Sequence, residues 1–381
     1  MTQRIIAPIR IFLQDSRAGG ILLLCCTFLS LILSNIPAVS SSYTSFWNLS
    51  SHTAHDLLLP HSVLHWINDG FMALFFFLAG MEIKKEMVDG ELSSFKKSTL
   101  PVFCAIGGMI VPAMLYALFN KGTATQNGWG IPMATDIAFS LGIASLLGKR
   151  VPLSLKIFLT ALAIIDDLGA IIVIALFYGS SIHMGWLLAS AALTVTGWLL
   201  MRKATKANLL HYIIGILLWY CMFNSGIHAT VAGVVFAFLI PNQQLEHLQH
   251  KIHGLVHFII MPVFALANTA IIFPAGIFGA LNSRLSWGIM FGLFVGKPLG
   301  ICLTALWLVR KKVAELPNAV NWHHMIGAGI LAGIGFTMSI FITTLAFADA
   351  GQQNIAKISI LIISFFSMLS GYIWLAKKKT S

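Results

Sequence analysis

A succession of apolar runs, each about 20 residues long, constrains this chain more than any other feature. An α-helix rises 1.5 Å per residue, so about 20 apolar residues span a bilayer. Of the 381 residues, 57% are hydrophobic and only 10% are charged, whereas soluble chains are about 25% charged. The sequence therefore predicts an all-α polytopic membrane protein with about twelve transmembrane helices. They lie near residues 11–34, 62–87, 98–119, 125–147, 153–178, 184–201, 208–222, 226–240, 252–274, 287–309, 324–348 and 355–376.

The basic residues indicate how the chain is oriented. The net charge is +11, which in a soluble protein would suggest nucleic acid, but here the Lys and Arg residues fall in alternate loops. With a cytoplasmic N-terminus, the outer segments hold only Lys121, Arg284 and Lys357. This bias follows the positive-inside rule. It predicts a multi-pass protein of the bacterial inner membrane, with both termini cytoplasmic and no nucleic-acid partner.

The remaining composition predicts one transmembrane domain over residues 1–381, with no cofactor. The cysteines lie in apolar runs without CxxC spacing, which favours reduced packing thiols. Residues 35–60 are rich in Ser and Thr and lack Lys and Arg, so we expect an external loop, in which residues 40–47 could form a small β-hairpin. The cysteines are Cys25, Cys26, Cys104, Cys221 and Cys302.

Two predicted spans are interrupted at comparable places. Glycines and a proline precede Asp136 in span four, and glycines precede Thr337 in span eleven. Each span is the middle member of a three-span group, spans 3–5 and 10–12, and the groups have opposite directions. This pattern predicts inverted repeats with two broken, crossing helices, although glycine also serves close helix packing. The interrupting residues are Gly128, Gly130, Pro132, Gly327, Gly329, Gly333 and Gly335.

Four charged residues, Asp136, Asp166, Asp167 and Lys297, lie well inside apolar runs. Each costs roughly 2.5 to 3.5 kcal/mol at mid-bilayer, so a functional role is expected. Asp166 and Asp167 are adjacent on one helix, project about 100° apart and can line a cavity side by side. Burial and mutual repulsion favour the protonated form, while Na⁺ prefers oxygen ligands. Competition between Na⁺ and protons for these carboxylates would produce exchange; a structural pair neutralised by its neighbours is the alternative.

The other buried polar residues each have two interpretations. Asp136 could offset the positive ends of half-helices in spans four and eleven, which we favour, or ligate the ion directly. Thr135 could supply an oxygen ligand or bond its own helix. Lys297 could pair with Asp166 and compete with the ion or proton, or it could stabilise the crossing of the broken helices.

Titratable residues also gather at the cytoplasmic ends of spans two and nine. Glu82 and Glu86 are four residues apart, on one helix face, with Lys84 and Lys85 between them. Because histidine titrates near pH 6.5, we expect a pH sensor here, with an ordinary solvated interface as the alternative. His228 and Asp69, near the outer face, are weaker candidates. The span-nine residues are Glu246, His247, His250, His253 and His257.

Two other classes of membrane protein also place acidic residues within the bilayer. An intramembrane aspartyl protease needs acids from two helices, whereas Asp166 and Asp167 are adjacent on one. A cation channel would favour an open, ion-lined path over a lysine placed opposite the acids. A secondary transporter, which is not an enzyme, agrees better with both observations.

Taken in order, these motifs resemble the NhaA family of sodium/proton antiporters over essentially the whole chain. The resemblance implies export of Na⁺ or Li⁺ against incoming H⁺, pH and sodium homeostasis, activity that rises at alkaline pH, and a homodimer joined partly by the first external loop. It implies that Asp167 is the principal ion and proton carboxylate and that Asp166 pairs with Lys297. It places Asp136 and Thr135 at the crossing, and ties Glu82, Glu86 and 246–250 to the pH response. The motifs are 134–139 (ATDIAF), 164–170 (IIDDLGA), 225–230 (SGIHAT), 295–298 (VGKP) and 335–339 (GFTMS).

Overall fold

The computed structural model describes residues 18–51, 56–179, 181–202, 208–274 and 276–377. Throughout these ranges the regular structure is helical, and extended pairing is limited to an isolated bridge between Ser50 and Ser62. The first predicted span begins near residue 11, so its start lies outside the described residues, as do the basic residues before Ala18.

Within the described residues, nine helices are long and apolar enough to cross a membrane, or ten when one bent pair counts as a single span. This confirms the all-α polytopic prediction. The predicted count of twelve is supported in part, because spans seven and eight correspond to the shorter helices α11 (Leu209–Ser225) and α12 (Val231–Leu239). The nine are Ala18–Asn35 (α2), Val63–Val88, Ser98–Asn120, Gln126–Leu146, Leu153–Phe177 (α9), Met184–Met201 (α10), Asn242–Asn268, Arg284–Arg310 and Ala350–Ala376 (α20).

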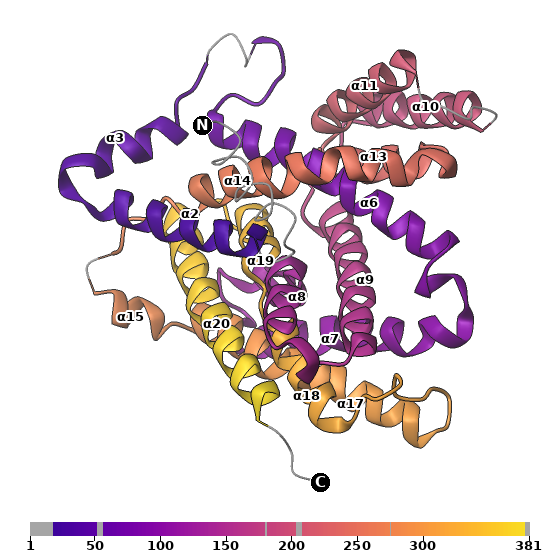
Figure 1. Ribbon diagram of the computed structural model, residues 1–381. Helices are drawn as coiled ribbons and strands as arrows, with labels where there is room; N and C mark the ends of the chain where they lie inside the picture. The colour runs from indigo at the N-terminus through magenta and orange to yellow at the C-terminus, as the bar shows by residue number, and fades with distance from the viewer. Residues whose placement is uncertain (1–17, 52–55, 180, 203–207, 275, 378–381) are drawn as a thin grey trace, which may run out of the picture. The chain divides into compact units, whose positions relative to one another are not determined.

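The chain forms two compact units, each assembled from separate stretches of sequence (Figure 1). Within the described ranges, unit 1 draws on residues 18–25, 94–170 and 273–377, and unit 2 on residues 26–93 and 171–272. Unit 1 thus gathers most of predicted spans 3–5 and all of spans 10–12, the two groups expected to repeat. Their inverted relation and the single-domain assignment stay predictions.

Unit 1 is built on helices that pack in pairs. α7 packs against α16 and α17, and α20 packs against α16, α18 and α19. Three of its elements are not α-helical: η3 and η4 are 3₁₀-helices, and η6 is a π-helical segment. The bounds are α7 Phe95–Asn120, η3 Gln126–Met133, α8 Ile137–Leu146, η4 Gly148–Arg150, α15 Ile277–Leu281, α16 Arg284–Phe291, η6 Gly292–Gly296, α17 Lys297–Arg310, α18 Trp322–Ala332 and α19 Phe336–Ala346.

Both predicted helix breaks are present in unit 1. In span four, η3 ends at Met133 and α8 begins at Ile137, with extended backbone between them. In span eleven, α18 ends at Ala332, α19 begins at Phe336, and the two halves are bent by 42°. Proline lacks a backbone N–H, so Pro132 cannot extend the preceding hydrogen-bond ladder.

Unit 2 is held together by close contacts between α6 and α12. A Cβ on Gly233 would come within 2.1 Å of the carbonyl oxygen of Ala73, and one on Gly80 within 2.8 Å of the Ala237 Cβ. Only glycine allows backbones to approach this closely. The remaining bounds are α3 Pro37–Trp47, α5 Val63–His65, η1 Trp66–Phe71, α6 Met72–Val88, η2 Glu91–Ser93, α13 Asn242–Leu255, η5 Val256–Ile260 and α14 Met261–Asn268.

The expected β-hairpin over residues 40–47 is wrong, because this stretch belongs to helix α3. Pro37 lies in the first turn. Backbone N–H groups in that turn have no acceptor within the helix, so the lack of an N–H in proline costs no hydrogen bond there. The hydroxyl of Thr44 donates to the carbonyl oxygen of Ser40 at 2.8 Å, and Tyr43 and Trp47 meet edge to face on one side of the helix. Side chains that bond back to the preceding turn are compatible with helix even where β propensity is high.

Candidate functional site

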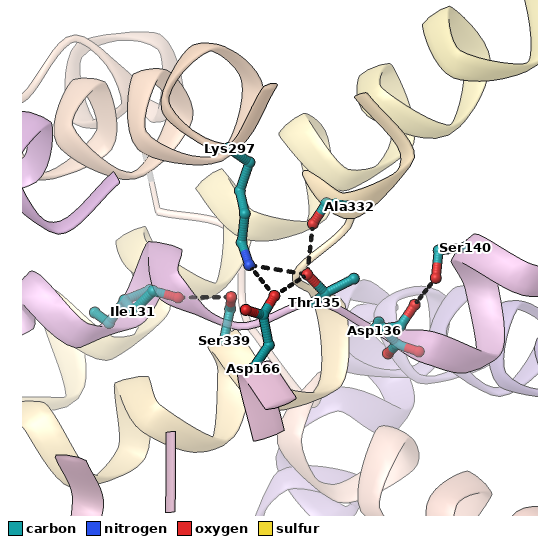
Figure 2. Close-up of polar contacts among 8 residues, drawn as sticks. All are labelled: Ile131, Thr135, Asp136, Ser140, Asp166, Lys297, Ala332 and Ser339. Atoms are coloured by element: carbon teal, nitrogen blue, oxygen red, sulfur yellow. Dashed lines mark hydrogen bonds and ion pairs between the residues drawn. The ribbon is translucent and has the colours of Figure 1, made fainter. Parts of the chain in front are cut away.

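The interrupted segments of spans four and eleven meet inside unit 1 (Figure 2). The backbone N–H of Asp136 donates to the carbonyl oxygen of Ile334 at 2.6 Å. The hydroxyl of Ser339 donates to the carbonyl oxygen of Ile131 at 2.7 Å. Backbone groups freed by the two breaks therefore bond across the crossing, and this satisfies them away from water.

Asp136 connects the beginnings of two half-helices. Its Oδ1 accepts from the N–H groups of Ala138 and Phe139 at 3.1 and 3.3 Å, at the start of α8. Its Oδ2 accepts from the N–H and hydroxyl of Thr337 at 3.1 and 2.6 Å, at the start of α19. Both N-termini carry partial positive charge, so the carboxylate lies where it would offset two helix ends; that role stays a prediction.

Asp166, on α9, lies beside the crossing with Lys297 and Thr135 (Figure 2). Lys297 Nζ forms an ion pair with Asp166 Oδ2, and both side chains are fully buried. Thr135 Oγ1 lies 2.7 Å from the same carboxylate oxygen, 2.9 Å from Lys297 Nζ and 3.0 Å from the carbonyl oxygen of Ala332. A hydroxyl has a single proton, so Thr135 donates to the carboxylate or to the carbonyl, but not to both fully.

The two carboxylate oxygens of Asp166 differ in their hydrogen bonding: Oδ2 contacts Lys297 and Thr135, whereas Oδ1 does not. Oδ1 is buried and accepts no hydrogen bond from the residues that the structure describes. A buried carboxylate oxygen in this condition requires an explanation. A proton or a bound cation would satisfy it.

Asp167 follows Asp166 on α9 and is 8% exposed, while Asp166 is fully buried. Gly169 lies close behind this pair, where a Cβ would come within 2.3 Å of Met109 Sδ on α7. Gly169 therefore allows α7 to pack closely against α9 beside the pair.

Local geometry explains the position of Lys297. It is the first residue of α17, directly after the π-helical segment η6, and π segments recur at functional sites because they shift the side chains that follow. α17 also packs closely on α7, since a Cβ on Gly300 would lie 2.1 Å from the carbonyl oxygen of Gly107. This contact fixes the lysine's helix against its neighbour.

The residues expected to respond to pH lie in unit 2, and the structure connects some of them. Lys85 Nζ lies 3.1 Å from Glu246 Oε1, in an exposed ion pair. Lys84 Nζ donates to the carbonyl oxygens of Phe238, at 2.8 Å, and of Ile240, which terminate α12. These contacts join Lys84 to the end of α12 and Lys85 to α13. Glu82 and Glu86 are half-buried on α6, and His247 and His250 are exposed on α13.

His228 and Asp69 are closer together than expected from the sequence. His228 Nε2 lies 3.3 Å from Asp69 Oδ1, and each side chain is 13% exposed. The backbone carbonyl of Asp69 accepts from Trp219 Nε1 at 2.9 Å, and His228 Nδ1 lies 2.9 Å from Thr230 Oγ1. Asp69 belongs to the π-helical segment η1.

Sequence reasoning missed three contributors to the crossing. Thr337 and Ser339 bond to it through their side chains, and Ala332 contributes a carbonyl oxygen. Their position was the available signal, because all three flank the glycine-rich break of span eleven, where freed backbone groups need partners.

Two interrupted helices that cross beside buried carboxylates and a lysine define a secondary transporter with discontinuous helices. Comparison with known proteins identifies the family, because residues 10–375 match the model described as Na⁺/H⁺ antiporter 1. The chain belongs to this family.

Relatives support the assignment over nearly the full length. A protein named Na(+)/H(+) antiporter NhaA from Flavobacterium psychrophilum is 48% identical over 369 residues, which cover 95% of this chain and 94% of the relative. A namesake from Shewanella amazonensis is 46% identical over 380 residues, covering 97% of both chains. Na(+)/H(+) antiporter NhaA 2 from Clostridium beijerinckii is 46% identical over 381 residues, covering 97% and 94%.

Proposed function

We propose that this protein exchanges Na⁺ for H⁺ across the bacterial inner membrane and so serves pH and sodium homeostasis. The observation that carries the proposal is the buried pair Asp166 and Asp167 beside the crossing of two broken helices. Membership of the Na⁺/H⁺ antiporter 1 family supports it. Li⁺, a smaller cation with the same charge and the same preference for oxygen ligands, is a second substrate of the same site.

The exchange rests on competition at the carboxylates. Asp167 is the principal ligand, because it is the less buried of the pair, and Asp166 contributes the Oδ1 oxygen. When the acids are protonated they present no net charge to a cation, and when they are ionised they bind one. Sodium and protons therefore occupy the pair alternately. Because the acids interact, they titrate as a pair.

Lys297 and Thr135 control whether the Asp166 carboxylate is compensated by the protein or by a bound cation. A cation that enters at Asp166 Oδ1 shares the carboxylate with the lysine, whose Nζ compensates the ionised group through Oδ2. Thr135 Oγ1, within 2.7 Å of that oxygen, adds a neutral ligand for the ion. Asp136 has four backbone or hydroxyl donors, which favours a role in holding the crossing over one in ligating the ion.

The pH response is assigned to residues of unit 2. Lys85 and Glu246 form an exposed pair, and His247, His250, Glu82, Glu86, Lys84 and His228 complete the proposed set. The Lys85–Glu246 pair joins α6 to α13, so a change in the charge of α13 with pH would alter its attraction to α6. We further propose that the protein acts as a homodimer in the bilayer, with both termini cytoplasmic.

Replacing Asp167 tests the function directly. In everted vesicles, adding Na⁺ or Li⁺ should collapse a preformed pH gradient with wild-type protein. With Asp167→Asn the rate should fall by about 100-fold, the effect of losing one buried charged ligand. Asp89→Asn, the same change at an exposed loop position, should behave as wild type. Equal responses from wild type and Asp167→Asn would remove this carboxylate from the mechanism.

A further inference from the structure

A groove on unit 1 has no part in the exchange described above. It lies where α7 ends and η3 begins, and its volume is about 490 Å³. Met114, Ala117 and Leu118 line it along the last turns of α7, while Lys121, Gln126 and Asn127 line it beyond the helix end. One part of the groove is therefore apolar and the other is polar and basic.

The basic part carries unusual charge for its side of the membrane. Lys121 is the basic residue that lines the groove. Arg284, also expected at the outer face, lies outside this lining, and Asn120 Nδ2 donates to its backbone carbonyl at 3.1 Å. The side chains of Lys121 and Arg284 are both exposed. Across the described part of the chain, neither forms an ion pair with a carboxylate.

Aromatic residues place this region at the depth of lipid headgroups. Trp129 lines the groove, and Trp287 is 41% exposed on the neighbouring helix α16. Tryptophan is enriched at the boundary between hydrocarbon and headgroups. Leu118 is 75% exposed and Met114 61% exposed, so the apolar part of the groove faces lipid chains.

We propose that this groove binds one phospholipid with an anionic headgroup from the outer leaflet. Its phosphate would lie at Lys121 and accept from the amides of Gln126 and Asn127, and an acyl chain would lie along Met114 and Leu118. Charge complementarity selects an anionic lipid over a zwitterionic one, since a basic residue near the surface attracts anionic lipid.

The bound lipid would support the broken helix of span four. The phenol of Tyr116, on α7, donates to the carbonyl oxygen of Thr125 at 2.6 Å, directly before η3. A Cβ on Gly128 would come within 2.3 Å of the same hydroxyl. The groove is thus built on the segment that leads to the crossing, and occupancy should stabilise that segment.

Thermal unfolding of the purified full-length protein in detergent tests this proposal without measuring transport. Titration with phosphatidylglycerol should raise the Tm of wild type more than titration with phosphatidylcholine. Lys121→Gln should weaken the apparent affinity for phosphatidylglycerol about fivefold, the effect of one basic residue. Ala117→Trp, which fills the apolar part, should abolish the difference between the lipids.

Lys311→Gln is the matched control, because Lys311 is an exposed lysine at the end of α17, outside the groove. It should respond to both lipids as wild type does. The proposal is overturned if phosphatidylcholine stabilises as well as phosphatidylglycerol, or if Lys121→Gln and Ala117→Trp both respond as wild type. Equal stabilisation by inorganic phosphate would indicate a soluble-anion site and would also overturn it.

Discussion

At the scale of single residues, the ion pair between Lys297 and Asp166 dominates the site. Both side chains are fully buried, and a charge left alone in such surroundings costs far more than the pair contributes. Because Thr135 also contacts both, three side chains from three separate stretches of sequence share one environment. A change in one of them should therefore alter the environment of the other two.

Lys297→Ala should destabilise the protein in a pH-dependent manner. Removing the lysine leaves Asp166 ionised and buried at alkaline pH, at a cost of about 3–5 kcal/mol. At acidic pH the carboxyl binds a proton and the cost falls, so the Tm difference from wild type should shrink as pH decreases. Thermal unfolding of purified protein across pH measures this.

The double variant Lys297→Ala, Asp166→Asn provides the control, because it removes both charges. It should regain most of the stability lost at alkaline pH. A constant Tm difference for Lys297→Ala at every pH would mean that the lysine acts through packing alone, contrary to the account above.

At the scale of elements, the contact between α7 and α17 positions the lysine. The backbones approach so closely that a Cβ on Gly300 would lie 2.1 Å from the carbonyl oxygen of Gly107. Lys297 is three residues earlier on the same helix, almost one turn away. The separation of these helices and the position of Nζ are therefore linked.

Gly300→Ala should push α17 away from α7. We expect a loss of about 1–3 kcal/mol from overpacking, together with slower exchange in the vesicle assay. Gly142→Ala is the matched control, since a Cβ there meets nothing within 4 Å and alanine favours helix by about 1 kcal/mol. If the two variants behave alike, the close contact does not position the lysine.

The elements also show how far sequence could predict this molecule. Gly and Pro marked both helix breaks, because these residues act on the backbone itself, and intramembrane charge marked Asp136, Asp166 and Lys297. The hairpin prediction was wrong because it relied on the β propensity of residues 40–47. These residues form helix α3, which also makes long-range contacts such as the hydrogen bond from the Tyr43 hydroxyl to the carbonyl oxygen of Leu266. The π-helical segments η1, η5 and η6 have no periodic signal, since their extra residue per turn arises from packing.

At the scale of the whole molecule, the placement of charge predicts orientation. The segments expected outside hold three basic residues, Lys121, Arg284 and Lys357, and the positive-inside rule then predicts that both termini are cytoplasmic. Both units contribute apolar helices long enough to span. Orientation determines which direction of exchange exports sodium.

Impermeant maleimide labelling of single-cysteine variants measures this orientation. In a background without the native cysteines, Ser51→Cys should react on intact cells, because this exposed residue follows the first span. Lys311→Cys should react only after the membrane is opened. The reverse labelling pattern would mean that the orientation is opposite to the predicted one. Reaction of both variants on intact cells would mean that the chain does not cross the membrane an odd number of times between the two positions, as the predicted spans require.

We expect sodium and protons to compete for Asp166 and Asp167. The most direct measurement is proton release when Na⁺ is added to purified protein in weakly buffered solution, with Na⁺ binding followed calorimetrically. We predict that binding releases protons near neutral pH and that Asp167→Asn releases fewer. Sodium binding to the wild type without proton release, at any pH where it binds, would contradict the account.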